Sequence, residues 1–113
     1  MVEKKELPPK EIEVGPYVYS ILCGDAPSRT QLGGDCGETD SSELVIRING
    51  DRVSGVRRET TLHEVLHALT DMAGLVEQYG SKTDEQWCRR VTPLLLDTLR
   101  RNPKLVAFLL SDG

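Results

Sequence analysis

The chain has 113 residues, of which 38% are hydrophobic and 28% are charged, and its net charge is −4. This length fits one domain with a single modest core. The negative charge disfavours a nucleic-acid partner held through its phosphates, and no apolar run approaches the roughly 20 residues of a membrane span.

The first ten residues are charged and contain Pro8–Pro9. We expect residues 1–10 to form a flexible lead-in to one domain that covers residues 11–113. The lead-in lacks the apolar stretch of a secretory signal. The three cysteines show no C-x-x-C spacing, and an odd count favours reduced thiols. These features together predict a cytoplasmic protein.

Residues 11–23 are rich in β-branched and aromatic side chains and are interrupted at Gly15–Pro16. They predict one bent strand or two short strands around a turn. Residues 24–42 are rich in Gly, Asp, Ser and Thr, so we expect mostly loop there. From Glu43 to Asn49 apolar and polar residues alternate. This period of two predicts a half-buried strand that ends in a turn at Asn49–Gly50.

The second half of the chain has helical periodicity. A first helix is predicted after Ser54, with Gly74 ending it, and a second from about Thr83 to about Arg101. A short third helix, Lys104 to Leu110, is expected to complete the core rather than to form a dimer contact, because a small domain needs every apolar helix. Strands followed by helices predict an α+β domain with helices on one face of a small sheet.

The first predicted helix contains His63, Glu64 and His67 in the order H-E-x-x-H. Positions i and i+4 lie on one helix face, so both imidazoles can direct a nitrogen at the same ion. Zinc bound there would activate a water, and Glu64 could accept its proton without binding the metal. Two incidental histidines on an amphipathic helix are the plainer explanation. We favour the metal site because the motif uses both histidines of the chain on a well-patterned helix.

A catalytic zinc needs a third protein ligand, and a carboxylate is the expected type. Asp71 lies on the histidine face, but the helix separates it from His63 by about 12 Å, too far for a shared ion. Asp71 is therefore expected either to accept a hydrogen bond from an imidazole or to be solvated. Asp84 and Glu85 open the next helix, and its antiparallel return would bring either one beside the histidines. Helical phase alone favours Asp84.

Three stretches resemble small zinc metallopeptidases encoded by phages and prophages. They are T-L-H-E-V-L-H-A-L at 61–69, D-E-x-x-C-x-x-V at 84–91 and R-N-P-K-L-V-x-F-L at 101–109. The upstream Gly37-Glu38-Thr39-Asp40, followed by the strand Leu44–Ile48, also fits that group, and the resemblance covers roughly residues 11–110. In such proteins a glutamate that opens the next helix completes the histidine pair, the gluzincin arrangement, which implies Glu85 ahead of Asp84. The resemblance also implies a minimal zincin-like fold, with a small, mostly antiparallel sheet of about three strands and the active-site helix beneath it.

The implied activity is zinc-dependent hydrolysis of a peptide or protein, with Glu64 as the general base. The strand Glu43–Asn49 could pair with an extended substrate, and Tyr17, Tyr19 and Tyr79 are the tyrosines available to stabilise an oxyanion. One alternative is a zinc-containing regulatory or protein-binding module of phage origin with little turnover. Another is a metal-free interaction domain. The sequence selects neither a substrate nor an oligomeric state.

Overall fold

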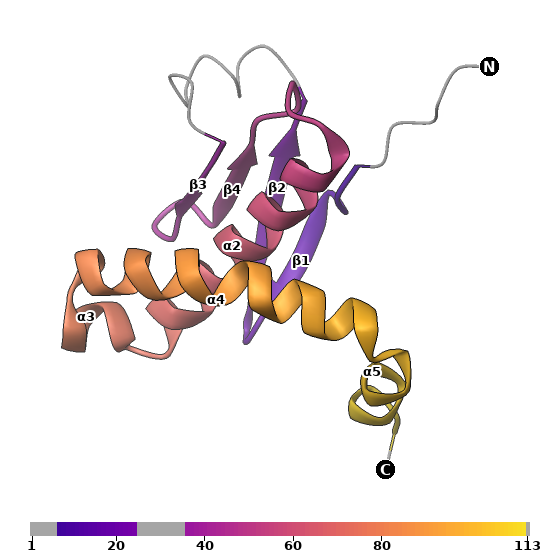
Figure 1. The fold of residues 1–113 in the computed structure, drawn as a ribbon. Helices are drawn as coiled ribbons and strands as arrows, with labels where there is room; N and C mark the ends of the chain where they lie inside the picture. The colour runs from indigo at the N-terminus through magenta and orange to yellow at the C-terminus, as the bar shows by residue number, and fades with distance from the viewer. Residues whose placement is uncertain (1–6, 25–35, 113) are drawn as a thin grey trace.

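The computed structural model describes residues 7–24 and 36–112, in which strands come first and helices follow (Figure 1). The described part of the chain is an α+β fold, as its element order predicts. The strands are β1 (Glu11–Val14), β2 (Tyr17–Cys23), β3 (Gly37–Asp40) and β4 (Val45–Ile48). The helices are α2 (Ser54–Met72), α3 (Leu75–Tyr79), α4 (Ser81–Arg101) and α5 (Pro103–Leu109). Most of the predicted lead-in lies outside the described residues.

The sheet is mixed and has four strands in the order β1-β2-β4-β3. β1 pairs with β2 and β3 pairs with β4 in antiparallel fashion, whereas β2 and β4 are parallel. The prediction of about three strands was wrong, because β3 lies in a segment that was expected to be loop. Its sequence, Gly-Glu-Thr-Asp, has little intrinsic preference for strand. Pairing with β4 therefore makes this segment a strand.

The first two strands form the hairpin that the interruption at Gly15–Pro16 predicts. Val14 and Tyr17 face each other across the turn, and Gly15 takes the positive φ of 57° that glycine adopts without strain. A Cβ at Gly15 would also collide with the sulfur of Met72 at the end of α2. The turn thus brings the hairpin close to the helix.

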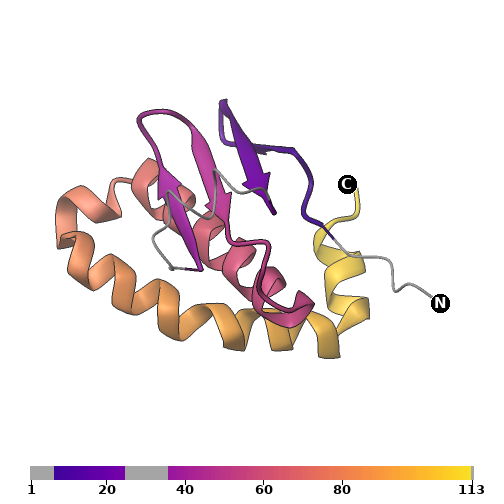
Figure 2. The ribbon, with the colours of Figure 1, turned by 90° about the horizontal axis from the view of Figure 1, so that it is seen from above.

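The core lies between one face of the sheet and α2 (Figure 2). Ile46 and Ile48 of β4 are fully buried, as the alternation predicts. The strand is shorter than the predicted Glu43–Asn49, because Leu44 has a positive φ of 57° and belongs to the turn before it. The α2 residue in the buried cluster is Ala68, whose small side chain lets the helix axis approach the strands closely. The remaining members are Val14, Tyr19 and Ile21.

The helices follow the predicted pattern with small shifts at their ends. α2 begins at Ser54, so Val53 is its N-cap, and it ends just before Gly74, whose φ is 77°. α4 begins at Ser81, two residues earlier than predicted, and contains Pro93 in its interior. Gly80 is the N-cap of α4. The short helix α3 was not predicted.

The C-terminal helix departs most from expectation. Every residue of α5 is exposed or partly exposed, and α5 packs against α4 rather than the sheet. Figure 1 shows it projecting away from α2 and the strands. The prediction that this helix completes the core was therefore wrong. Within residues 7–24 and 36–112, no helix combines the length and apolarity needed to cross a bilayer.

Candidate metal centre

The histidine pair lies on the middle turns of α2, on a face that is partly open to solvent. The side chains of His63 and His67 are 18% and 16% exposed. Glu64 is almost completely buried. One side of this helix packs on the sheet, and the i to i+4 spacing then places the two imidazoles edge to face, with ring centroids 4.7 Å apart. The helix alone thus brings two imidazole groups together.

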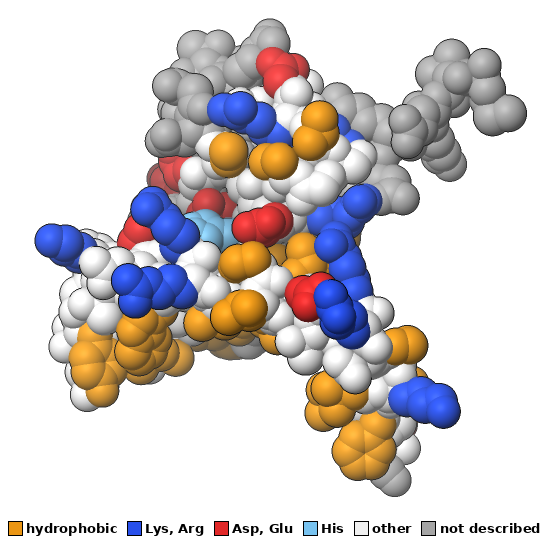
Figure 3. Space-filling model, in the orientation of Figure 1, with side chains coloured by type: hydrophobic (Ala, Val, Ile, Leu, Met, Phe, Trp, Pro, Cys, Tyr) orange, Lys and Arg blue, Asp and Glu red, His pale blue; other side chains and the backbone are white. Residues whose placement is uncertain are grey.

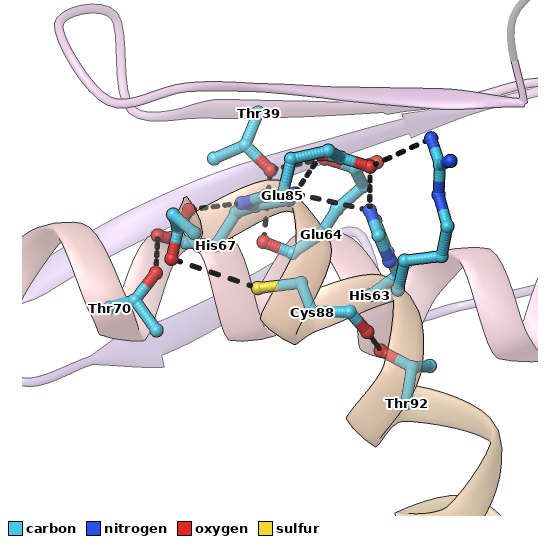
Figure 4. Close-up of polar contacts among 10 residues, drawn as sticks. Thr39, His63, Glu64, His67, Thr70, Glu85, Cys88 and Thr92 are labelled. Atoms are coloured by element: carbon cyan, nitrogen blue, oxygen red, sulfur yellow. Dashed lines mark hydrogen bonds and ion pairs between the residues drawn. The ribbon is translucent and has the colours of Figure 1, made fainter. Parts of the chain in front are cut away.

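The return of α4 adds a carboxylate to this pair. Glu85 Oε2 lies 2.7 Å from His67 Nε2, and Glu85 Oε1 lies 3.3 Å from His63 Nε2. The two Nε2 atoms are 3.1 Å apart. Figure 4 shows Glu85 reaching toward both rings from α4. The predicted antiparallel return therefore brings together His63, His67 and Glu85, the three side chains of the expected ligand set.

These three groups could hold one metal ion. Imidazole nitrogens and a carboxylate are typical zinc ligands, bound at about 2.0–2.2 Å, which separates ligand atoms of a tetrahedral site by roughly 3.3–3.5 Å. The observed separations of 2.7–3.3 Å are close to these values. Small side-chain movements would therefore be enough to admit an ion between the three groups.

Asp84 contacts the opposite edge of one of the two rings. Its carboxylate is buried, and Oδ2 lies 2.6 Å from His67 Nδ1. Burial lowers the pKa of His67, but the hydrogen bond to Asp84 and the charges of Glu64 and Glu85 outweigh burial and raise the pKa overall. A proton fixed on Nδ1 leaves Nε2 as the nitrogen available to an ion. Asp84 therefore orients His67 and does not join the three converging ligand atoms.

Cys88, one turn after Asp84, is also buried, and its thiol lies 3.9 Å from Asp84 Oδ1. His67, Asp84 and Cys88 form a second group of potential metal ligands. Burial and the nearby carboxylates raise the pKa of Cys88 to about 12, so the metal-free thiol stays protonated. Because Asp84 already engages His67 Nδ1, we interpret this group as a hydrogen-bonded support for the imidazole.

Thr39, a residue that sequence reasoning missed, holds the expected general base. Its hydroxyl lies 2.7 Å from Glu64 Oε1 and 2.9 Å from the Glu64 carbonyl oxygen. Burial raises the pKa of Glu64, and the hydrogen bond from Thr39 and the two imidazoles lower it, with a net upward shift. Thr39 comes from β3, the strand that the sequence did not predict. Its segment, Gly37–Asp40, belongs to the family resemblance, but no sequence pattern singled out Thr39 itself.

Asp71 and the three tyrosines, which were also considered for the site, do not belong to the group formed by the histidines and Glu85. Asp71 is exposed and lies at the rim of the pocket that contains the histidines. Asp84, rather than Asp71, makes the expected contact with an imidazole. Tyr19 is buried in the core, and Tyr79 packs against Trp87. Tyr17 lines a separate, smaller cavity. Within the described residues, none of the three tyrosines lines the pocket that contains the histidines.

The histidines and Glu85 open into a pocket of about 820 Å³ between β3, α2 and the start of α4. Figure 3 shows the pale blue imidazole surface beside red carboxylates above α4. Arg89 is the basic residue among its described lining, and its guanidinium lies 3.5 Å from Glu85 Oε1. The strand at this edge is β3. β4, which was expected to receive a substrate strand, lies between β2 and β3 and has no free edge.

Comparisons of the chain with family models, with curated proteins and with solved structures found no match.

Proposed function

We propose that the chain binds one zinc ion through His63, His67 and Glu85 and hydrolyses peptide bonds with Glu64 as the general base. The observation that carries this proposal is the convergence of two Nε2 atoms and a carboxylate within 2.7–3.3 Å, with a buried carboxylate on the next residue after His63. A purely structural site closes its coordination shell with four protein ligands, whereas three ligands beside an open pocket are typical of catalytic zinc.

The ion, when bound, supplies Lewis acidity and lowers the pKa of a coordinated water. Glu64 then accepts the proton of the attacking water and delivers it to the leaving amine. Thr39 holds one oxygen of Glu64, so the other is available to the pocket. Asp84 keeps the proton of His67 on Nδ1. Each of these residues acts through a hydrogen bond that already exists in the metal-free protein.

The pocket favours an extended peptide as substrate. β3 is an edge strand, and Gly37, Glu38 and Thr39 all line the pocket. The free backbone groups of an edge strand can pair with a peptide, which would lie along the wall opposite the histidines. Peptide pairing is therefore proposed for β3 in place of β4.

Metal content by mass spectrometry tests the site. We expect about one zinc per native chain, and loss of zinc from His63→Ala, His67→Ala and Glu85→Ala. Asp84→Asn is expected to bind zinc about 10–100-fold more weakly but still with the native stoichiometry at saturation. Asp71→Asn, which changes an exposed carboxylate at the rim, is the matched control and should bind like native protein. Native protein that takes up no zinc at neutral pH would overturn the proposal.

Turnover is tested with zinc-loaded protein and a fluorescent unfolded protein substrate. Glu64→Gln is expected to keep its zinc and to lose hydrolysis by about 10²–10⁴-fold. If native protein binds zinc but shows no hydrolysis that depends on Glu64, the zinc-containing binding module becomes the supported function.

A further inference from the structure

The helix α4 has an apolar side that the other described elements leave about half exposed or more. Trp87, Val91 and Leu94 are 48%, 49% and 70% exposed. At 3.6 residues per turn, these positions fall on one stripe of the helix. Cys88 and Thr92, which are buried, lie about 100° away. The apolar arc of α4 is therefore wider than α2 can cover.

The apolar side continues onto the neighbouring helices. Tyr79 of α3 is 52% exposed and packs against Trp87 with ring centroids 5.9 Å apart. At the other end of α4, Phe108, Leu109 and Leu110 are 76%, 60% and 77% exposed. Figure 3 shows orange side chains in separate groups, below the α3 end of α4 and on α5. We call this set the α4–α5 surface; it consists of Tyr79, Trp87, Val91, Leu94, Leu105, Phe108, Leu109 and Leu110.

The α4–α5 surface is larger than a monomer usually exposes. With roughly 150–250 Å² for a large apolar side chain, the exposed fractions of the eight residues correspond to on the order of 700–1,200 Å². The largest apolar patch on a typical monomer is about 300–600 Å². Each partner in a standard protein interface buries about 800 Å². The range of exposed area therefore includes the area that one subunit contributes to a stable dimer.

We propose that the α4–α5 surface binds the same surface of a second copy of this chain. Two-fold symmetry requires a surface that complements itself. An antiparallel pair of α4 helices crossing at Leu94 would bring Arg90 of one copy near Asp97 of the other. Asp97 is 59% exposed beside its own Arg101, so it can accept a second cation. Charges of opposite sign thus flank the apolar stripe on either side of the crossing.

Dimerisation through this surface leaves the metal centre open. Glu85 and Arg89 lie about 160–200° around α4 from Trp87, on the opposite side of the helix. Both line the pocket. The dimer is therefore compatible with the proposed zinc site and does not depend on it.

Sedimentation equilibrium and light scattering of the full chain test the dimer between about 1 and 100 µM. We expect native protein to dimerise in this range, with and without zinc. Leu94→Glu and Phe108→Glu should each weaken the dimer by at least about 100-fold, because each change acts twice in a symmetric interface. Val18→Glu, at a 48% exposed position on β2, is the matched control and should remain dimeric.

Trp87 provides a second measurement, because it is the one tryptophan of the chain and lies in the α4–α5 surface. Its emission should shift to the red on dilution of native protein and should not change on dilution of Leu94→Glu. Circular dichroism checks that each variant folds. Native protein that stays monomeric at 100 µM, or a dimer that both glutamate variants retain, overturns the proposal. A monomer that sediments with vesicles containing anionic phospholipid would identify a membrane as the occupant and would overturn it equally.

Discussion

Two adjacent carboxylates contact His67 from different directions, and their different lengths decide their roles. Helical phase correctly predicts that Asp84 points inward, since it is buried whereas the Glu85 side chain is 44% exposed. The inward position takes Asp84 to Nδ1, on the side of the ring away from His63. Glu85 starts from a more exposed position, and its additional methylene lets it reach both Nε2 atoms. Glu85, the more exposed of the two residues, is therefore the one that contacts both histidines.

The hydrogen bond from Thr39 to Glu64 gives a prediction for the metal-free protein. Thr39→Val removes a donor to a buried carboxylate, so we expect it to lower the free energy of unfolding at pH 7 by about 1–3 kcal/mol. Thr39→Ser keeps the donor and should recover most of this loss. Chemical unfolding in the presence of a chelator measures both changes.

The same variant should show a defined pH dependence. The pKa of Glu64 is already raised by burial, and loss of the Thr39 hydroxyl raises it further. A raised folded-state pKa gives stability that is present at low pH and is lost as the pH rises through that pKa. The destabilisation by Thr39→Val should therefore be larger at pH 8 than at pH 4. An equal loss of stability at both pH values would show that the hydrogen bond does not act on the charged carboxylate.

At the scale of the elements, β3 matters because it approaches α2 very closely. A Cβ added to Gly37 would lie 2.6 Å from Thr60 Cγ2 and 3.1 Å from both Glu64 Cγ and the carbonyl oxygen of Arg47. Thr60 and Glu64 belong to α2, and Arg47 belongs to the neighbouring strand. A side chain at this position would therefore have to separate β3 from the helix or from β4. Glycine here sets the distance at which Thr39 reaches Glu64.

Gly37→Ala is accordingly expected to destabilise the fold by about 1–3 kcal/mol, the usual cost of overpacking. Gly55→Ala is the matched control, because a Cβ at Gly55 meets no heavy atom within 4 Å and lies in the first turn of α2. That change should be neutral or stabilise the protein by up to about 1 kcal/mol. Thermal unfolding of the two variants provides the comparison. Similar stability in both would show that β3 can move away from α2 at little cost.

At the scale of the whole molecule, the apolar residues are divided between a small core and an exposed surface. The buried hydrophobic cluster of the described residues comes from β1, β2, β4 and α2. α4 packs against α2, and Asp84 of α4 contacts His67 of α2 at the candidate metal site. An ion bound between α2 and α4 would therefore add a further link between these two helices.

Metal removal should then lower the melting temperature. Free zinc at about 100 times its dissociation constant adds about 2.7 kcal/mol to the free energy of unfolding, which corresponds to roughly 10 °C for a chain of this size. Differential scanning fluorimetry with and without a chelator measures the shift in native protein. His67→Ala should show no such shift, and an equal shift in that variant would place the ion elsewhere.

Local sequence patterns were sufficient to predict most of the strands and helices and the proximity of the two histidines. The alternation in β4, the turn at Gly15–Pro16 and the periodicity of α2 and α4 all depend on neighbouring residues, and each was confirmed. The i to i+4 spacing likewise places His63 and His67 together by helix geometry alone. Their use of zinc and the role of Glu64 stay predictions.

Tertiary structure decided whatever depends on segments distant in the chain. β3 is a strand because it pairs with β4. Its polar sequence therefore predicted neither the strand nor the contact of Thr39 with Glu64. The choice between Asp84 and Glu85 required the position of α4 against α2. The apolar composition predicted a buried α5, yet this helix packs mainly against α4 after Asn102 and its residues stay largely exposed. An apolar helix sequence indicates that the helix will pack against some surface. Only the tertiary structure shows whether that surface belongs to the same chain.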